Sequence, residues 1–95
     1  MPSFRVTMTI GALAPGVAPT QVVPAAEGAA AQLTTVEASG VAVVSGAARI
    51  TVRFTADDAE LAQQIAQHTA DATGAVAAVL DWRLTERVGG GWYNR

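Results

Sequence analysis

Hydrophobic and polar residues alternate with a period of two in residues 4–10, 49–55 and 76–87. In the first of these segments the apolar positions are Phe4, Val6, Met8 and Ile10. Because side chains point to opposite faces of a strand in turn, this period predicts strands that are covered on one face only. Residues 35–44 are small and β-branched and predict another strand, in which Gly40 is expected to mark a bulge.

Two segments between the strands carry helical signals. Pro24 in a first turn and the alanines after it predict a helix that begins at Thr20 or Val23 and ends near Leu33. Asp57 as N-cap, with Glu60 three residues later, predicts the start of a second helix, and Gly74 predicts its end. Residues 11–19 predict a loop, and residues 45–48 a hairpin turn.

The element order is therefore β-α-β-β-α-β over residues 1–88, which predicts a single α+β domain. Two crossovers joined by a hairpin give a four-stranded antiparallel sheet with both helices on one face. This order resembles the ferredoxin-like fold along nearly the whole chain; no family motif accompanies it, and the fold hosts unrelated functions. Residues 89–95 are expected to form a glycine-rich hinge and a tail, in which Trp92 and Tyr93 dock onto the domain or a neighbour.

The chain has 95 residues, and 21 of its apolar residues are alanines, so a few larger side chains must form most of the core. The expected core residues are Phe4, Val6, Met8, Ile10, Leu33, Ile50, Val52, Phe54, Leu61, Ile65, Leu80, Trp82 and Leu84.

Five of the six arginines occupy strand positions that alternate with the apolar ones and therefore point to the outer face of the sheet. Most of the other residues at these outward positions are threonines. The candidate binding face consists of Arg5, Thr7, Arg49, Thr51, Arg53, Arg83, Thr85 and Arg87. Such a face is a solvated surface, a self-association surface in which Glu37, Asp81 or a partner's carboxylates match the arginines, or a site for an anionic ligand. Nucleic acid is the least favoured ligand, because the outward positions lack aromatic residues and the chain has a net charge of −2.

Other chemistry is sparse. The absence of cysteine excludes disulfides and thiolate metal sites. His68 is the only histidine, so no catalytic triad can be argued from it. Helix capping explains Asp57, Asp58 and Glu60. Glu86 is better explained as a residue at a strand end than as a carboxylate in a pocket. We therefore expect no catalytic residue, metal or cofactor.

The absence of lysine is typical of a GC-rich bacterial genome. No secretory signal and no apolar stretch long enough to span a bilayer is evident, so a cytoplasmic location without membrane contact is expected.

The sequence thus favours a non-enzymatic binding or interaction module. Homo-oligomerisation is expected through the arginine face, through the first helix, whose only charge is Glu27, or through the aromatic tail. One alternative is a small dimeric enzyme resembling ferredoxin-like monooxygenases or isomerases, with an apolar pocket between sheet and helices near Trp82, His68 and Glu86. The other is anion or nucleic-acid binding on the arginine face.

Overall fold

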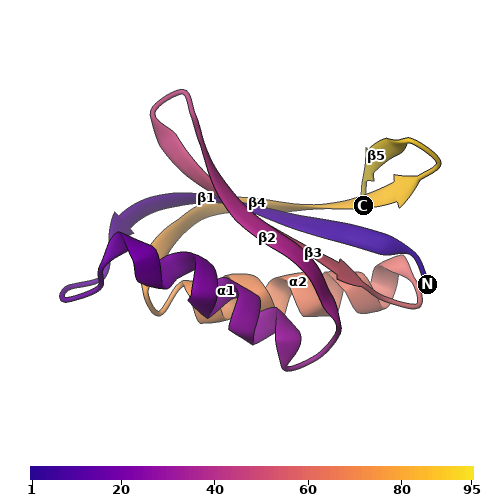
Figure 1. The fold of residues 1–95 in the computed structure, drawn as a ribbon, viewed down its shortest axis with the longest axis horizontal. Coiled ribbons are helices and arrows are strands. Elements are labelled where there is room, and N and C mark those ends of the chain that lie inside the picture. The colour runs from indigo at the N-terminus through magenta and orange to yellow at the C-terminus, as the bar shows by residue number, and fades with distance from the viewer.

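The chain folds into a five-stranded antiparallel sheet with two helices on one face (Figure 1). In the computed structural model, which describes residues 1–95, the elements are β1 (Ser3–Leu13), a 3₁₀ helix (Pro19–Gln21), α1 (Val22–Ala31), β2 (Val36–Val44), β3 (Ala47–Thr55), α2 (Ala59–Thr73), β4 (Ala77–Val88) and β5 (Gly91–Asn94). The strand order is β2-β3-β1-β4-β5. The predicted α+β class is confirmed, and the predicted number of four strands is wrong.

The additional strand comes from the segment expected to be a hinge and tail. Gly89 has a φ of +60°, which an L side chain rarely adopts, and the turn pairs Val88 with Gly91. Strand β5 then continues antiparallel to β4, and the Arg95 amide donates to the Leu84 carbonyl at 2.9 Å. The glycines therefore build a tight hairpin, which rises on the side of the sheet opposite the helices (Figure 1).

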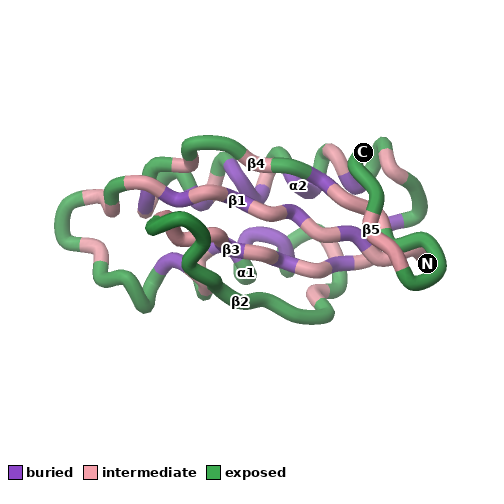
Figure 2. Tube along the Cα trace, turned by 90° about the horizontal axis from the view of Figure 1, so that it is seen from above, coloured by how far each residue is buried: buried purple, intermediate pink, exposed green.

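The apolar side chains at alternate positions of the central strands are buried against the helices. Phe4, Val6 and Met8 of β1 are fully buried and lie opposite Phe54, Val52 and Ile50 of β3, respectively. Seen from above the sheet, buried and half-buried residues alternate along both strands (Figure 2). The helices contribute mostly alanines to this core, so they pack close to the sheet and to each other. The core is a continuous cluster of 17 buried residues.

Three leucines expected in the core are exposed instead. Leu80 is the unpaired residue at a register shift in the pairing of β1 with β4, between Val79 and Asp81, and its exposed fraction is 64%. A bulge reverses the side on which a residue points, so the inward parity predicted for Leu80 was wrong. Leu33 lies in the turn after α1 and is exposed. Leu61 lies in the first turn of α2, beside the buried face of that helix, and is also exposed.

Several predicted boundaries also change. The bulge in β2 lies between Val36 and Ala38, and not at Gly40, which pairs regularly with Thr51. The α2 N-cap is Asp58, whose carboxylate accepts a hydrogen bond from the Leu61 amide at 2.8 Å. Strand β1 continues to Leu13, through part of the predicted loop. Neither helix has the length and apolar character needed to cross a bilayer.

Candidate ligand site on the open sheet face

The open face of the sheet is an ordered array of arginine and threonine side chains. The strand register places Arg49, Thr9 and Asp81 in one row across β3, β1 and β4. The next rows are Thr51, Thr7 and Arg83, and then Arg53, Arg5 and Thr85. All of the predicted binding-face residues lie on these three strands, because pairing in register preserves the parity of each strand.

Trp92 of β5 joins this face at the end nearest the chain termini. The Arg5 Cζ atom lies 3.8 Å from the centroid of the Trp92 ring. The Cζ atoms of Arg53 and Arg87 lie 5.2 Å and 5.8 Å from the same centroid. Guanidinium groups at these distances are attracted to the electron-rich face of an indole, so Trp92 holds three of the five arginines in place.

Glu37 supplies a carboxylate to the same part of the face. The bulge in β2 brings Glu37 beside Ser3, whose hydroxyl donates to Oε1 at 2.7 Å, and beside Arg53, whose Nε donates to the same oxygen at 3.1 Å. The hydrogen bond from Ser3 is the largest cause of a lowered pKa at Glu37; partial burial opposes it, and Arg53 reinforces it. Arg53 is therefore already paired within the protein.

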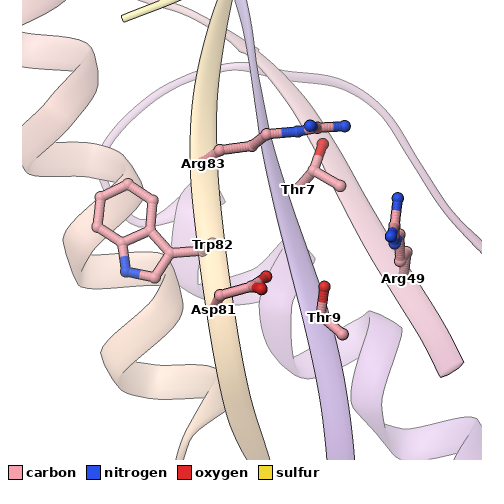
Figure 3. A pocket seen from close by; sticks show the side chains of 6 residues that line it. All are labelled: Thr7, Thr9, Arg49, Asp81, Trp82 and Arg83. Carbon is pink, nitrogen blue, oxygen red and sulfur yellow. The ribbon is translucent and has the colours of Figure 1, made fainter.

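A hollow of about 330 Å³ lies on the remaining part of the face. It is lined by Thr7, Thr9, Arg49, Asp81, Trp82 and Arg83 (Figure 3). The Arg83 side chain extends above Thr7 toward β3, where Arg49 lies, whereas the Asp81 carboxylate points toward Thr9 (Figure 3). Trp82 turns away from these groups, toward α2.

The two arginines of this hollow are not neutralised by the protein. Neither Arg49 nor Arg83 forms an ion pair or a side-chain hydrogen bond, in contrast to Arg53 and Arg95. The Nε atom of Arg49 is buried, and no protein group accepts a hydrogen bond from it. It is the only buried side-chain nitrogen or oxygen in the chain that lacks a partner. A donor that is buried without an acceptor is costly, so the protein itself leaves Arg49 incompletely satisfied.

A second hollow, of about 310 Å³, lies between β1, β3 and the edge strand β2. Its lining residues are Arg5, Ala38, Ser39, Gly40, Thr51 and Arg53. Both of its arginines already interact within the protein, Arg5 with Trp92 and Arg53 with Glu37 and Trp92. The first hollow is therefore the stronger candidate site.

The remaining sequence candidates lie away from this face. His68 of α2 makes a hydrogen bond with the side chain of Gln32, the C-cap residue of α1, at 3.0 Å. Glu86 accepts a hydrogen bond from Nε of Arg95 at 2.9 Å in an ion pair. Tyr93 lies opposite Glu86 in the β4–β5 pairing and is half-exposed.

One member of the face was assigned elsewhere by sequence reasoning, and two were named without being counted as site residues. Trp92 was assigned to a tail, although a two-residue turn at Gly89 and Gly90 would have paired it with Arg87 and placed both on one face. Glu37 was expected only as a carboxylate that could match the arginines, and its side of the sheet was left open, because only the bulge in β2 directs it to this face. Asp81 had the correct outward parity and was likewise expected only as a carboxylate that could match the arginines.

Compared with known proteins, the chain matches no family model, no curated protein and no solved structure. Any function assigned to it therefore rests on the geometry of this face.

Proposed function

We propose that the protein is a small binding module that holds an anionic group on the open face of its sheet. The observation that carries the proposal is that Arg49 and Arg83 line one hollow without an ion pair, and that the buried Nε of Arg49 has no hydrogen-bond partner in the protein. Guanidinium groups bind carboxylate or phosphate oxygens through charge-assisted hydrogen bonds, and the hydroxyls of Thr7 and Thr9 supply further donors on the floor of the hollow.

The charge distribution supports an anion rather than a second copy of the same face. Five arginines and two carboxylates, Asp81 and Glu37, leave the open face with a net charge of +3, although the chain as a whole carries −2. Two such faces packed together about a two-fold axis would repel each other. Self-association through the arginine face is therefore not the proposal that we favour.

The enzyme and nucleic-acid alternatives find less support. Both hollows lie on the open face, whereas the enzyme alternative requires an apolar pocket between sheet and helices, where the packed core lies. Trp92 is the aromatic residue of the open face, and Arg5 already lies over its ring, where a nucleobase would stack.

We also infer that the fold is a ferredoxin-like sandwich with one added strand. Strands β2-β3-β1-β4 and the two helices follow the β-α-β-β-α-β order of that arrangement, and β5 extends the sheet beside β4. In this arrangement the helices leave one face of the sheet free, and this face carries the proposed site.

NMR titration with inorganic phosphate and with acetate tests the proposed function. We expect a saturable shift of the Arg49 Nε–H resonance and of the Thr7 and Thr9 amide resonances at low ionic strength. The affinity should fall as salt is added, because salt screens exposed charges within about 10 Å at 0.1 M. The double variant Arg49→Gln with Arg83→Gln should lose the saturable shifts.

The matched control is Arg95→Gln, which removes one positive charge from the opposite side of the sheet, where Arg95 pairs with Glu86. This variant should bind phosphate as the wild type does. The proposal is wrong if the wild type shows no saturable shift, or if Arg95→Gln weakens binding as much as the double variant.

A second proposal concerns self-association, and the edge of β2 supports it. Strand β2 pairs only with β3, so its outer backbone groups have no partner strand, and residues 38–44 contain neither a charge nor a proline. Val41 and Val43 are exposed on this strand. A long, neutral, exposed edge is a template for another strand. We propose that β2 of a second copy pairs with it antiparallel about a two-fold axis, because a neutral strand does not repel itself.

A further inference from the structure

Asp81 does not contribute to binding of a simple anion in the hollow. Its carboxylate lies in the hollow with Arg49 and Arg83, yet it forms no ion pair and no side-chain hydrogen bond with either of them. The other carboxylate of the face, Glu37, accepts hydrogen bonds from Ser3 and Arg53. Asp81 is therefore an unpaired carboxylate in a hollow whose other charged groups, Arg49 and Arg83, are unpaired cations.

A free carboxylate at this position repels a simple anion. The Cα atoms of Asp81 and Arg83 are two residues apart on β4, which is about 7 Å at the usual rise of a strand. Asp81 and Arg49 are separated by one intervening strand, so their Cα atoms are about 10 Å apart at the usual strand spacing. Over these distances the carboxylate opposes part of the attraction that the two guanidinium groups exert on a small anion.

The two kinds of charge occupy different ends of the hollow. Arg83 reaches over Thr7 toward the side of β3, whereas the Asp81 carboxylate lies beside Thr9 (Figure 3). A ligand with an anionic group at the Arg83 end and an ammonium group at the Asp81 end would satisfy both. Such a ligand also turns the repulsion from Asp81 into a charge-assisted hydrogen bond.

We propose that the hollow selects compact dipolar molecules, in which an anionic group and a primary ammonium group are separated by a few bonds. The anionic group binds between Arg49 and Arg83, and the ammonium group donates to Asp81. This inference rests on the proposed anion-binding function and names its ligand class. Carboxylates and phosphates share the required anionic chemistry, and probes of both kinds distinguish them.

Two pairs of nearly isosteric probes test the inference by NMR titration. The carboxylate pair is β-alanine and butyrate, and the phosphate pair is phosphoethanolamine and propyl phosphate. Only the first member of each pair carries an ammonium group. We expect the wild type to bind that member about five- to tenfold more tightly, since one exposed charge-assisted hydrogen bond contributes about 1 kcal/mol. A preference confined to one pair identifies the anionic group that the site takes.

The variant Asp81→Asn should affect the two members of a pair in opposite directions. It should bind the simple anion more tightly than the wild type does and the dipolar molecule less tightly, so that the preference disappears. Glu37→Gln is the matched control, because it neutralises the other carboxylate of the face and should leave the preference intact. Circular dichroism checks that both variants are folded, which we expect because Asp81 is exposed.

The outcomes separate this inference from the proposed function. If the wild type binds both members of each pair equally, dipolar selection is wrong and anion binding stands. If Asp81→Asn retains the preference, or if Glu37→Gln removes it, Asp81 does not bind the ammonium group and the inference is overturned. If the wild type binds no probe, the proposed function fails, and the inference fails with it.

Discussion

Trp92 is the residue on which three arginines of the open face converge. Their Cζ atoms lie between 3.8 Å and 5.8 Å from its ring centroid, so a truncation of this side chain removes several contacts at once. We predict that Trp92→Ala lowers the free energy of unfolding by about 2 kcal/mol, from lost cation–π attraction and lost apolar burial. Urea denaturation measures this change, and Trp82 remains as the fluorescent reporter.

Tyr93 provides the control for this prediction. It is the neighbouring aromatic residue of β5, and 53% of its surface is exposed. Tyr93→Ala should therefore cost less than half as much as Trp92→Ala. Equal losses would mean that β5 is held by its backbone pairing with β4 and not by the indole ring.

The carboxyl group of Glu37 gives the protein a defined response to acid. Its pKa is lowered from the usual 4.5, first of all by the hydrogen bond from Ser3. A group with a lowered pKa in the folded state stabilises the fold above its unfolded pKa, and this contribution is lost as the pH falls through the folded pKa. We predict that Ser3→Ala raises the pKa of Glu37 toward 4.5, measured from the carboxyl ¹³C shift during an acid titration.

The same substitution should alter stability in the direction that linkage requires. Stability at neutral pH should fall relative to that at a pH below the lowered pKa, so the acid limb of the stability curve becomes flatter. Glu37→Gln, which has no titrating group at this position, should flatten it further. An unchanged pKa for Glu37 in Ser3→Ala would show that the hydrogen bond does not form in solution.

The β2–β3 hairpin depends on a two-residue turn. Val44 pairs with Ala47, and both turn residues have positive φ, +53° at Ser45 and +78° at Gly46. Two-residue hairpin turns of this kind favour Asn followed by Gly, because serine is strained in the left-handed region. We predict that Ser45→Asn raises the free energy of unfolding by about 0.5 kcal/mol, as measured by thermal and urea denaturation.

Gly46→Ala tests the same turn in the opposite sense. No atom lies near the position of an added Cβ, so backbone strain alone should lower the free energy of unfolding, by about 1 kcal/mol. If both substitutions were neutral, the turn would have a different conformation in solution. The register of β2 on β3, which positions Glu37 and the β2 edge, would then need to be measured directly.

Charge and exposed apolar surface are separated across the molecule. The open face is positive, the helix side carries most of the carboxylates, and the neutral β2 edge lies between them. If β2 pairs with a second copy, the mass measured by sedimentation equilibrium should rise with protein concentration. We predict that Val43→Lys keeps the protein monomeric without loss of stability, because 74% of Val43 is exposed and a charge on an edge opposes pairing.

Leu80→Lys is the control for the self-association experiment. Leu80 is also an exposed apolar residue, but it lies on β4, on the other side of the sheet centre. This variant should associate as the wild type does. A wild type that stays monomeric at all concentrations, or equal effects of the two substitutions, would contradict pairing through β2.

Sequence reasoning located the candidate face correctly wherever strand parity continued without interruption. The direction of a side chain in a regular strand depends only on the backbone, so alternation placed Arg5, Arg49 and Arg53 on one side without knowledge of the strand neighbours. The same reasoning failed at Leu80 and made no assignment for Glu37, because a bulge changes the parity of a strand and its position is set by pairing with another strand.

Local sequence patterns therefore determine the helices and strands, which alternate positions of each strand are buried, and the placement of the arginines on one side of the sheet. Long-range pairing decides which of those arginines are free. Trp92, Glu37 and Asp81 come from different strands, and only the sheet brings them to the same face. The physical reason is that a cation becomes a binding group only if no neighbour neutralises it, and the neighbours of Arg49 and Arg83 are defined by contacts between residues far apart in the chain.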